Sequence, residues 1–177
     1  MPEALILCGS ADPEGVTRAM CVSARSHLEA MGYSSELMVL SDLGISHCTD
    51  CGGCSSGRCV IDDGMGEVYR RFASADLLVL ASPIHFSGPS SIIKTAMDRF
   101  QMYWFDRTLA HPSRCVALLC GGSPEPRFSF TVSIFRAFCI TTGMVWSGHL
   151  EVPDTDSRGG EGVDDAVGAF LADVIGP

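Results

Sequence analysis

Short apolar runs alternate along the chain with longer segments in which apolar residues recur every three or four positions. Near-continuous apolar runs predict the strands of a parallel sheet, because such strands are covered on both faces. Five runs have this pattern, at residues 3–8, 35–40, 76–81, 115–120 and 144–152. The helical spacing predicts five helices, at residues 16–31, 64–74, 89–103, 127–141 and 163–175.

The regular alternation of strands and helices predicts an α/β fold, a doubly wound parallel sheet with helices on both faces. The chain of 177 residues can bury one sizeable core, and no internal linker divides it. We therefore expect a single domain over residues 1–177. The polar segment at residues 153–162 is predicted to be a loop within this domain.

The chain carries 12 basic and 21 acidic residues, a formal net charge of −9. This charge disfavours nucleic acid as a partner, because no basic stripe is left to neutralise a phosphate backbone. No run of about 18 apolar residues is present, and the first residues lack the basic start of a signal peptide. We therefore expect no membrane span and a soluble, cytoplasmic protein.

Nine cysteines are an unusual number for such a protein. A cytosolic compartment keeps thiols reduced, so these residues are expected to be metal-bound, redox-active or buried rather than disulfide-linked. Five of them lie in apolar runs and are predicted to pack in the core: Cys8, Cys21, Cys115, Cys120 and Cys139.

The other four cysteines lie in the run HCTDCGGCSSGRC at residues 47–59. Their spacing, C-x2-C-x2-C-x4-C, contains the close thiolate triplet that ferredoxins use for a [4Fe-4S] cluster and adds a fourth thiolate nearby. Structural zinc more often joins two separated C-x-x-C pairs, so iron-sulfur is favoured over zinc, an empty site or oxidised pairs. Gly52, Gly53 and Gly57 allow the positive φ angles that wrapping such a centre requires. The candidate ligands are Cys48, Cys51, Cys54 and Cys59.

Three turns that follow predicted strands are rich in Gly, Ser and Pro, at residues 9–17, 82–91 and 121–127. Ligands of doubly wound sheets bind at the carboxyl ends of the strands, so these turns are expected to share one edge. The first turn opens a helix and offers backbone N–H groups and hydroxyls to a phosphate. It lacks the lysine of a P-loop and the GxGxxG of a dinucleotide fold. A purely structural turn is the alternative interpretation.

Taken together, these segments resemble the NADPH-dependent FMN reductases, and among them the iron-sulfur flavoproteins. The resemblance spans residues 5–123 and rests on GSADPEGVT, CTDCGGCSSGRCVIDDGM, SADLLVLASPIHFSGPSSIIKTAMDRF and LLCGGSPEP. It implies a flavodoxin-like, five-stranded sheet of order 2-1-3-4-5. The chain departs from the common family pattern at DPEGV in the phosphate turn and at His85, where many relatives have Tyr.

The resemblance also implies the cofactors. The three turns would bind FMN, with Ser10 and Thr17 at its phosphate, and the cysteine loop at residues 47–64 would hold a [4Fe-4S] cluster that aerobic preparation can remove. The implied FMN-binding residues are Gly9, Ser10, Gly15, Val16, Thr17, Pro83, Ile84, His85, Phe86, Ser87, Gly88, Gly121, Gly122 and Ser123. NAD(P)H would be a transient electron donor, a small molecule or a ferredoxin-type protein the redox partner, and a homodimer or homotetramer the assembly.

The sequence therefore predicts an FMN-dependent oxidoreductase that passes electrons between FMN and a [4Fe-4S] cluster. Two alternatives stay open. One is an NAD(P)H-dependent FMN or quinone reductase with a structural or empty cysteine loop, and the other is a flavodoxin-like electron carrier or redox sensor. No Ser/His/Asp set favours a hydrolase, and no catalytic side chain is singled out.

Three further expectations concern packing. Because the strand at 35–40 should lie beside the strand at 3–8, the cysteine loop is expected on the same edge as the phosphate turn. Asp62 and Asp63 are predicted to cap the helix at 64–74. Lys94 is predicted to pair with Asp98 one helical turn later, and the aromatic residues at 100–105 to pack in the core.

Overall fold

The computed structural model describes residues 1–176 and contains the parallel sheet that the sequence predicts. Its long strands lie in the order β2-β1-β3-β5-β6, which is the predicted order 2-1-3-4-5 once the short β4 is set aside. The strands are β1 (Glu3–Cys8), β2 (Ser34–Val39), β3 (Leu77–His85), β5 (Arg114–Cys120) and β6 (Val145–Val152). The two-residue strand β4 (Gly88–Pro89) pairs antiparallel with the end of β3.

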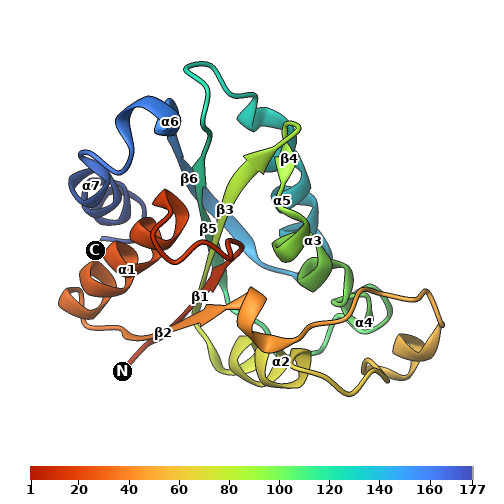
Figure 1. The fold of residues 1–177 in the computed structure, drawn as a ribbon. Coiled ribbons are helices and arrows are strands. Elements are labelled where there is room, and N and C mark those ends of the chain that lie inside the picture. Colours follow the sequence, from red (N-terminus) through yellow and green to blue (C-terminus); the bar gives the residue numbers. More distant parts are fainter. Residues whose placement is uncertain (177) are drawn as a thin grey trace.

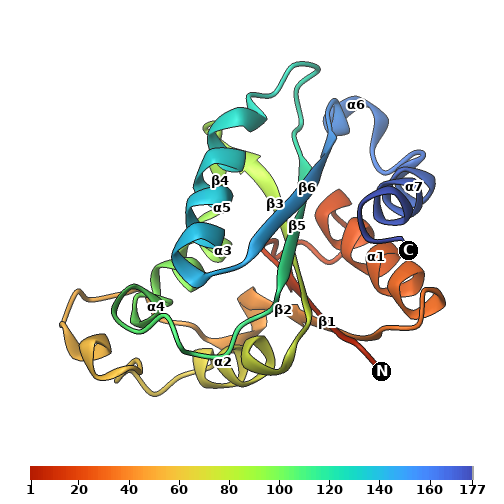
Figure 2. The ribbon, with the colours of Figure 1, turned by 180° about the vertical axis from the view of Figure 1, so that it is seen from behind.

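Helices cover both faces of the sheet, as Figures 1 and 2 show from opposite sides. One face carries α1 (Val16–Ala30) and α7 (Val163–Ile175), which pack against each other. The other face carries α2 (Met65–Ser74), α3 (Ser91–Asp98) and α5 (Phe128–Thr142). All five predicted helical segments are therefore helical, with small changes at their ends.

Successive side chains of each strand point to opposite faces of the sheet, so the core has two parts, one on each face. Leu5 and Leu7 of β1 pack with α2, α3 and α5, whereas Ile6 and Cys8 pack with α1 and α7. Both sets are at most 2% exposed, which explains why the strand reads as a continuous apolar run rather than an alternating one. The five cysteines predicted to lie in the core are all buried.

The predicted helix at 89–103 is wrong in one respect: it is two helices, α3 and α4 (Met102–Phe105). Between them Phe100 N–H bonds to Met97 O (3.0 Å) and Tyr103 N–H to Phe100 O (3.1 Å), so the chain tightens into turns with three-residue spacing. The break buries Phe100 and Tyr103 but leaves Trp104 and Phe105 exposed. The prediction that residues 100–105 pack in the core is therefore only half confirmed.

Three shorter elements lie in the connections between these strands and helices. The predicted loop at 153–162 contains the helix α6 (Thr155–Arg158), which corrects the sequence expectation. Single 3-10 turns follow β2 (η1, Leu40–Leu43) and lie within the cysteine loop (η2, Gly53–Ser56). Over residues 1–176, no helix is long and apolar enough to cross a membrane.

Candidate functional site

A pocket of about 610 Å³ opens at the carboxyl ends of β1 and β3, and we call it the carboxyl-edge pocket. It gathers seven of the residues predicted to bind FMN: Gly9, Ser10, Gly15, Val16, Thr17, Pro83 and His85. The sequence reasoning missed its other lining residues, which are Ala11, Asp12, Glu14, Ile92, Cys120, Thr155, Asp156, Gly159 and Gly160. The volume is in the range of pockets that hold small-molecule cofactors.

Close packing fixes the turn between β1 and α1. Gly9 N–H donates to Ala81 O (2.8 Å), and the buried Ser90 hydroxyl donates to Gly9 O (2.5 Å). A Cβ at Gly9 would lie 2.8 Å from the Ile93 Cβ, so only glycine fits this approach of the turn to α3. The first turn residue is thus held by the neighbouring strand and helix.

The start of α1 offers donors to an anion. Its N-cap residue is Gly15, and no side chain caps the first N–H groups of the helix. Thr17, predicted to bind phosphate, is buried, and its hydroxyl lies 3.2 Å from the Cys120 sulfur. Among the described residues that line the pocket none is Lys or Arg, whereas Asp12 and Glu14 are acidic. The pocket lining therefore offers an anion backbone N–H groups and hydroxyls but no cationic side chain.

The segment predicted as a turn at residues 82–91 begins as strand, because β3 continues to His85, and it contributes only part of its predicted residues. Pro83 and His85 line the pocket, but Phe86 is fully exposed. Phe86 and Ser87 have positive φ angles of 50° and 65°, which closes the hairpin to β4. Ser87 O accepts a hydrogen bond from the Thr131 hydroxyl (3.2 Å), so the hairpin is tied to α5. Ile84, Phe86, Ser87 and Gly88 are not among the residues that line the pocket.

The turn after β5 is covered by the chain that follows β6. Backbone N–H groups of Asp154, Thr155 and Asp156 donate to the carbonyls of Ser123, Gly121 and Gly122, respectively, at 2.8 to 3.2 Å. The predicted residues Gly121, Gly122 and Ser123 do not line the pocket, and of the three only Gly121 is buried, whereas Ser123 is exposed. The polar residues 153–162 show no helical periodicity, so nothing in the sequence indicates that this segment packs against the turn after β5.

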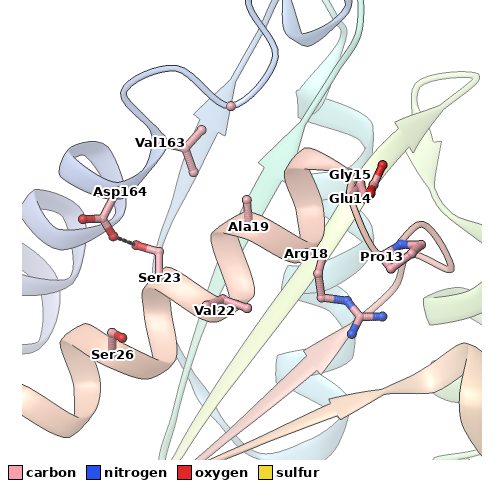
Figure 3. Close-up of a pocket in the computed structure, with 11 residues that line it drawn as sticks. Pro13, Glu14, Gly15, Arg18, Ala19, Val22, Ser23, Ser26, Val163 and Asp164 are labelled. Carbon is pink, nitrogen blue, oxygen red and sulfur yellow. Dashed lines mark hydrogen bonds between the residues drawn. The ribbon is translucent and has the colours of Figure 1, made fainter.

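A second hollow, about 400 Å³, runs along the outer side of α1 (Figure 3). The Ser23 hydroxyl donates to Asp164 Oδ1 (2.5 Å), which joins α1 to the start of α7. Arg18 points away from Asp164, toward the turn that contains Pro13. Of the residues predicted to bind FMN, only Gly15 lines this hollow, so the carboxyl-edge pocket is the better candidate.

The cysteine loop, residues 47–64, forms a pocket of its own of about 110 Å³, which we call the cysteine pocket. Cys48, Cys51, Cys54 and Cys59 all line it, and none is in a disulfide. Gly52 and Gly57 have positive φ angles of 70° and 84°, as predicted for the wrapping of this loop, whereas Gly53, predicted in the same way, does not. Among the described residues, no three His, Cys, Asp or Glu side chains converge closely enough to hold a metal ion.

Arg99, in the break between α3 and α4, lies beneath this loop with its side chain 0% exposed. Its Nε lies 3.2 Å from the Cys59 sulfur, and its two amino groups bond to the carboxylate of Asp63. Burial opposes ionisation of Cys59, but hydrogen bonds from Ile61 N–H and Arg99 outweigh it and lower the pKa of the thiol. The sequence offered no signal that this arginine is buried.

Asp63 joins the two ends of the cysteine loop. It accepts hydrogen bonds from Ser46 N–H (2.9 Å) and from Met65 N–H (3.0 Å) at the start of α2. Burial would raise the pKa of Asp63, but the bonds from Arg99 and from these N–H groups lower it to about 2. The predicted capping is wrong in part: the N-cap residue of α2 is Gly64, Asp63 binds the Met65 N–H from the position before it, and Asp62 makes no such bond. Asp63 also pairs with Arg99. The predicted Lys94–Asp98 pair is confirmed, at 2.6 Å.

The carboxyl-edge pocket and the cysteine pocket are formed by different residues. β2 lies beside β1 as predicted, but the backbone then passes through η1 and turns at Gly44 (φ 61°). The cysteine loop continues beyond α2 and packs against α4, away from α6 and β4 (Figures 1 and 2). No residue lines both pockets. The loop leaves the sheet at the carboxyl end of β2, beside the carboxyl end of β1 as predicted, but its cysteines do not join the carboxyl-edge pocket.

A parallel sheet of this order, with a glycine- and serine-rich turn at the start of α1, defines a flavodoxin-like α/β protein. The profile of the NADPH-dependent FMN reductase family matches residues 2–147. The chain belongs to this family of FMN-dependent oxidoreductases, as the sequence motifs predict.

Relatives outside the profile agree with this assignment. An iron-sulfur flavoprotein of Methanocaldococcus jannaschii is 29% identical over 171 residues, covering 96% of this chain and 87% of the relative. An iron-sulfur flavoprotein of Archaeoglobus fulgidus is 30% identical over 141 residues, covering 78% and 64% of the two chains. Among solved structures, an NAD(P)H:quinone oxidoreductase from Methanothermobacter marburgensis superimposes with a TM-score of 0.74 at 14% identity, covering 94% and 93%. This last similarity confirms the fold.

Proposed function

We propose that this chain exchanges electrons between FMN, bound in the carboxyl-edge pocket, and an iron-sulfur cluster, held in the cysteine pocket. The observation that carries the proposal is that four cysteines of one short loop line a single pocket in a member of an FMN reductase family. When bound, FMN supplies the ability to accept a hydride and to release single electrons. The protein supplies a binding site for each cofactor.

The carboxyl-edge pocket suits the phosphate end of FMN. The uncapped N–H groups at the start of α1 and the Ser10 side chain face the same pocket, and helix N-termini favour anions. Pro83 and His85 line the neighbouring wall, where a planar ring can lie against them. The predicted contacts with Gly121, Gly122 and Ser123 require that α6 leave part of this turn accessible.

The cysteine pocket suits a cluster better than a single zinc ion. Zinc binds thiolates at about 2.3 Å, so its four sulfurs must converge on one point. In a cubane cluster each cysteine binds a different iron, so the sulfurs stay farther apart around a larger object. The four cysteines line one pocket without converging on a point, which favours the second arrangement. Two relatives named iron-sulfur flavoproteins support the same assignment.

Metal analysis under anaerobic conditions tests the cluster. Protein purified without exposure to air is expected to contain both flavin and iron, with little zinc, and to show the broad visible absorption of an iron-sulfur centre. Serine at Cys51, the most exposed of the four thiols, is expected to lower the iron content and leave the flavin content unchanged. Flavin without iron in such a preparation would contradict the cluster and favour the reductase with an empty loop.

A charge placed in the first turn tests the phosphate site. Ser10→Asp is expected to weaken FMN binding at least tenfold, because a carboxylate would face the phosphate, and to change riboflavin binding less than twofold. Ser26→Asp is the matched control, since Ser26 lies on the exposed side of α1 in the neighbouring hollow (Figure 3). Equal losses for FMN and riboflavin would place the phosphate elsewhere.

A further inference from the structure

Arg99 is a buried charge whose partners are almost all in the cysteine loop. Its side chain is 0% exposed, and that of Asp63 is 10% exposed. The two form a forked pair, with Nη1 to Oδ2 at 2.7 Å and Nη2 to Oδ1 at 3.2 Å. A buried guanidinium requires such a counter-charge, because an unpaired one would lose its hydration without compensation. Asp63 therefore accounts for the charge of Arg99 but not for its remaining donors.

The remaining donors of Arg99 bind the backbone on both sides of the cysteines. Nη1 also donates to Ser46 O (2.8 Å), before the cysteine run, and Nη2 donates to Ile61 O (3.2 Å), after it. Because Ser46 N–H bonds in turn to Asp63, the loop is closed at its base around one guanidinium. The part of the loop nearest to Arg99 is consequently fixed before any ligand binds.

Only Nε is then left, and it points to a sulfur. The distance from Nε to the Cys59 Sγ is 3.2 Å, which is short for a nitrogen donor and a sulfur acceptor. An arginine could have donated this N–H to another carbonyl of the loop. Instead it donates this N–H to Cys59, one of the four thiols that line the cysteine pocket. Cys59 is partly buried, whereas Cys51 is exposed.

We propose that Arg99 is a positioning residue for the metal centre: it holds the Cys59 sulfur in place as the fixed ligand and donates an N–H bond to that sulfur while the cluster is bound. The proposal rests on the proposed function, because it requires a cluster in the cysteine pocket. Hydrogen bonds to ligand sulfurs, and positive charge nearby, stabilise the more reduced state of an iron-sulfur centre. Arg99 therefore raises the reduction potential of the cluster.

The wild-type protein itself provides the first test. Protein labelled with 15N only in arginine is reconstituted with iron and sulfide, reduced, and measured by pulsed electron paramagnetic resonance. A 15N coupling to the reduced cluster is expected. A cluster without such a coupling would overturn the role of Arg99 and leave the proposed function intact. Protein that takes up no iron at all would overturn both.

The second test replaces the guanidinium group of Arg99 but keeps its positive charge. Arg99→Lys retains a cation for Asp63 and loses the Nε–H to Cys59. Its cluster is expected to have a more negative reduction potential, an altered resonance spectrum and no 15N coupling, while the Kd for FMN stays within twofold of wild type. Arg70→Lys, in the exposed pair with Glu67, is the control and should change none of these quantities. An Arg99→Lys protein with the wild-type potential and spectrum would show that Arg99 only stabilises the fold of the loop, and it would overturn the proposal.

Discussion

Two glycines at the start of α2 differ in what a side chain would meet. A Cβ at Gly64 would fall well inside the contact distance of the Leu43 carbonyl oxygen, whereas a Cβ at Gly66 meets nothing within 4 Å. We expect Gly64→Ala to destabilise the fold by about 1–3 kcal/mol through overpacking against η1. Gly66→Ala is expected to stabilise it by about 0.5–1 kcal/mol, because alanine favours the helix.

Urea unfolding of the two alanine variants measures this difference. Both substitutions add the same methyl group two residues apart, but Gly64 is the N-cap residue and only Gly66 lies inside α2, so helix propensity favours alanine at Gly66 alone. Equal stabilities for the two variants would show that η1 does not pack against Gly64 as closely as the structure indicates.

At the scale of single residues, the sequence predicts functional side chains when they lie close together along the chain. It does not predict those that are brought together from distant segments by the fold. The four loop cysteines share one pocket because C-x2-C-x2-C-x4-C brings them together locally. Arg99 gives no such signal, because the partners that bury it lie at Ser46, Cys59 and Asp63, far away in the sequence. Cys120 was read as core packing, and it is buried, but it also lines the carboxyl-edge pocket.

At the scale of elements, the pair of Arg99 and Asp63 links the cysteine loop, α2 and the α3–α4 break. We expect Asp63→Asn to lower the free energy of unfolding by about 3–5 kcal/mol, since it leaves a buried guanidinium without a counter-charge. Glu29→Gln removes the exposed Arg25–Glu29 pair and is expected to cost less than about 0.5 kcal/mol. Chemical denaturation of both variants measures their free energies of unfolding. A larger loss for Asp63→Asn than for Glu29→Gln would show that burial makes the Arg99–Asp63 pair more important for stability.

The same carboxylate makes stability depend on pH. The pKa of Asp63 falls from its ordinary value of 3.8 to about 2 in the folded chain, so the stabilisation is complete above pH 4 and is lost as the pH falls toward 2. The shift corresponds to about 2 kcal/mol. The stability difference between wild type and Asp63→Asn is therefore expected to shrink by this amount between pH 5 and pH 2. A difference that stays constant over this range would contradict an ionised Asp63.

The elements themselves follow closely from the sequence, because near-continuous apolar runs and helical periodicity reflect burial on the two faces of the sheet. All five predicted strands and all five helical segments are present. The break at Arg99 was missed, since the apolar spacing continues through it and only a long-range ion pair marks the site. The helix α6 was missed because its four residues are polar and held by backbone bonds to the turn after β5.

At the scale of the whole molecule, α4 and α5 carry exposed apolar side chains. Trp104, Phe130 and Ile140 are 64%, 57% and 72% exposed. Arg107 lies over the Trp104 ring and bonds to Ile140 O, so α4 and the end of α5 form a continuous surface. Exposed apolar patches of this kind mark interfaces. We expect a second copy of the chain to cover this one.

Light scattering tests the assembly. Wild-type protein is expected to have at least twice the mass of the 18.8 kDa chain, and Ile140→Glu is expected to dissociate it. Val22→Glu, at an exposed apolar residue on α1 across the sheet, is the matched control and should leave the mass unchanged. A wild-type monomer at high protein concentration would contradict the predicted homo-oligomer.

The closure of the cysteine loop by Ser46 and Asp63 has an evolutionary consequence. A segment whose ends are joined at its base can change length at little entropic cost to the rest of the chain, because that cost grows only slowly with length. Insertions and deletions between Cys54 and Cys59 are thus tolerable while the sheet stays unchanged. Arg99 and Asp63 must be kept together or lost together in such changes, since either one alone would leave a buried charge behind.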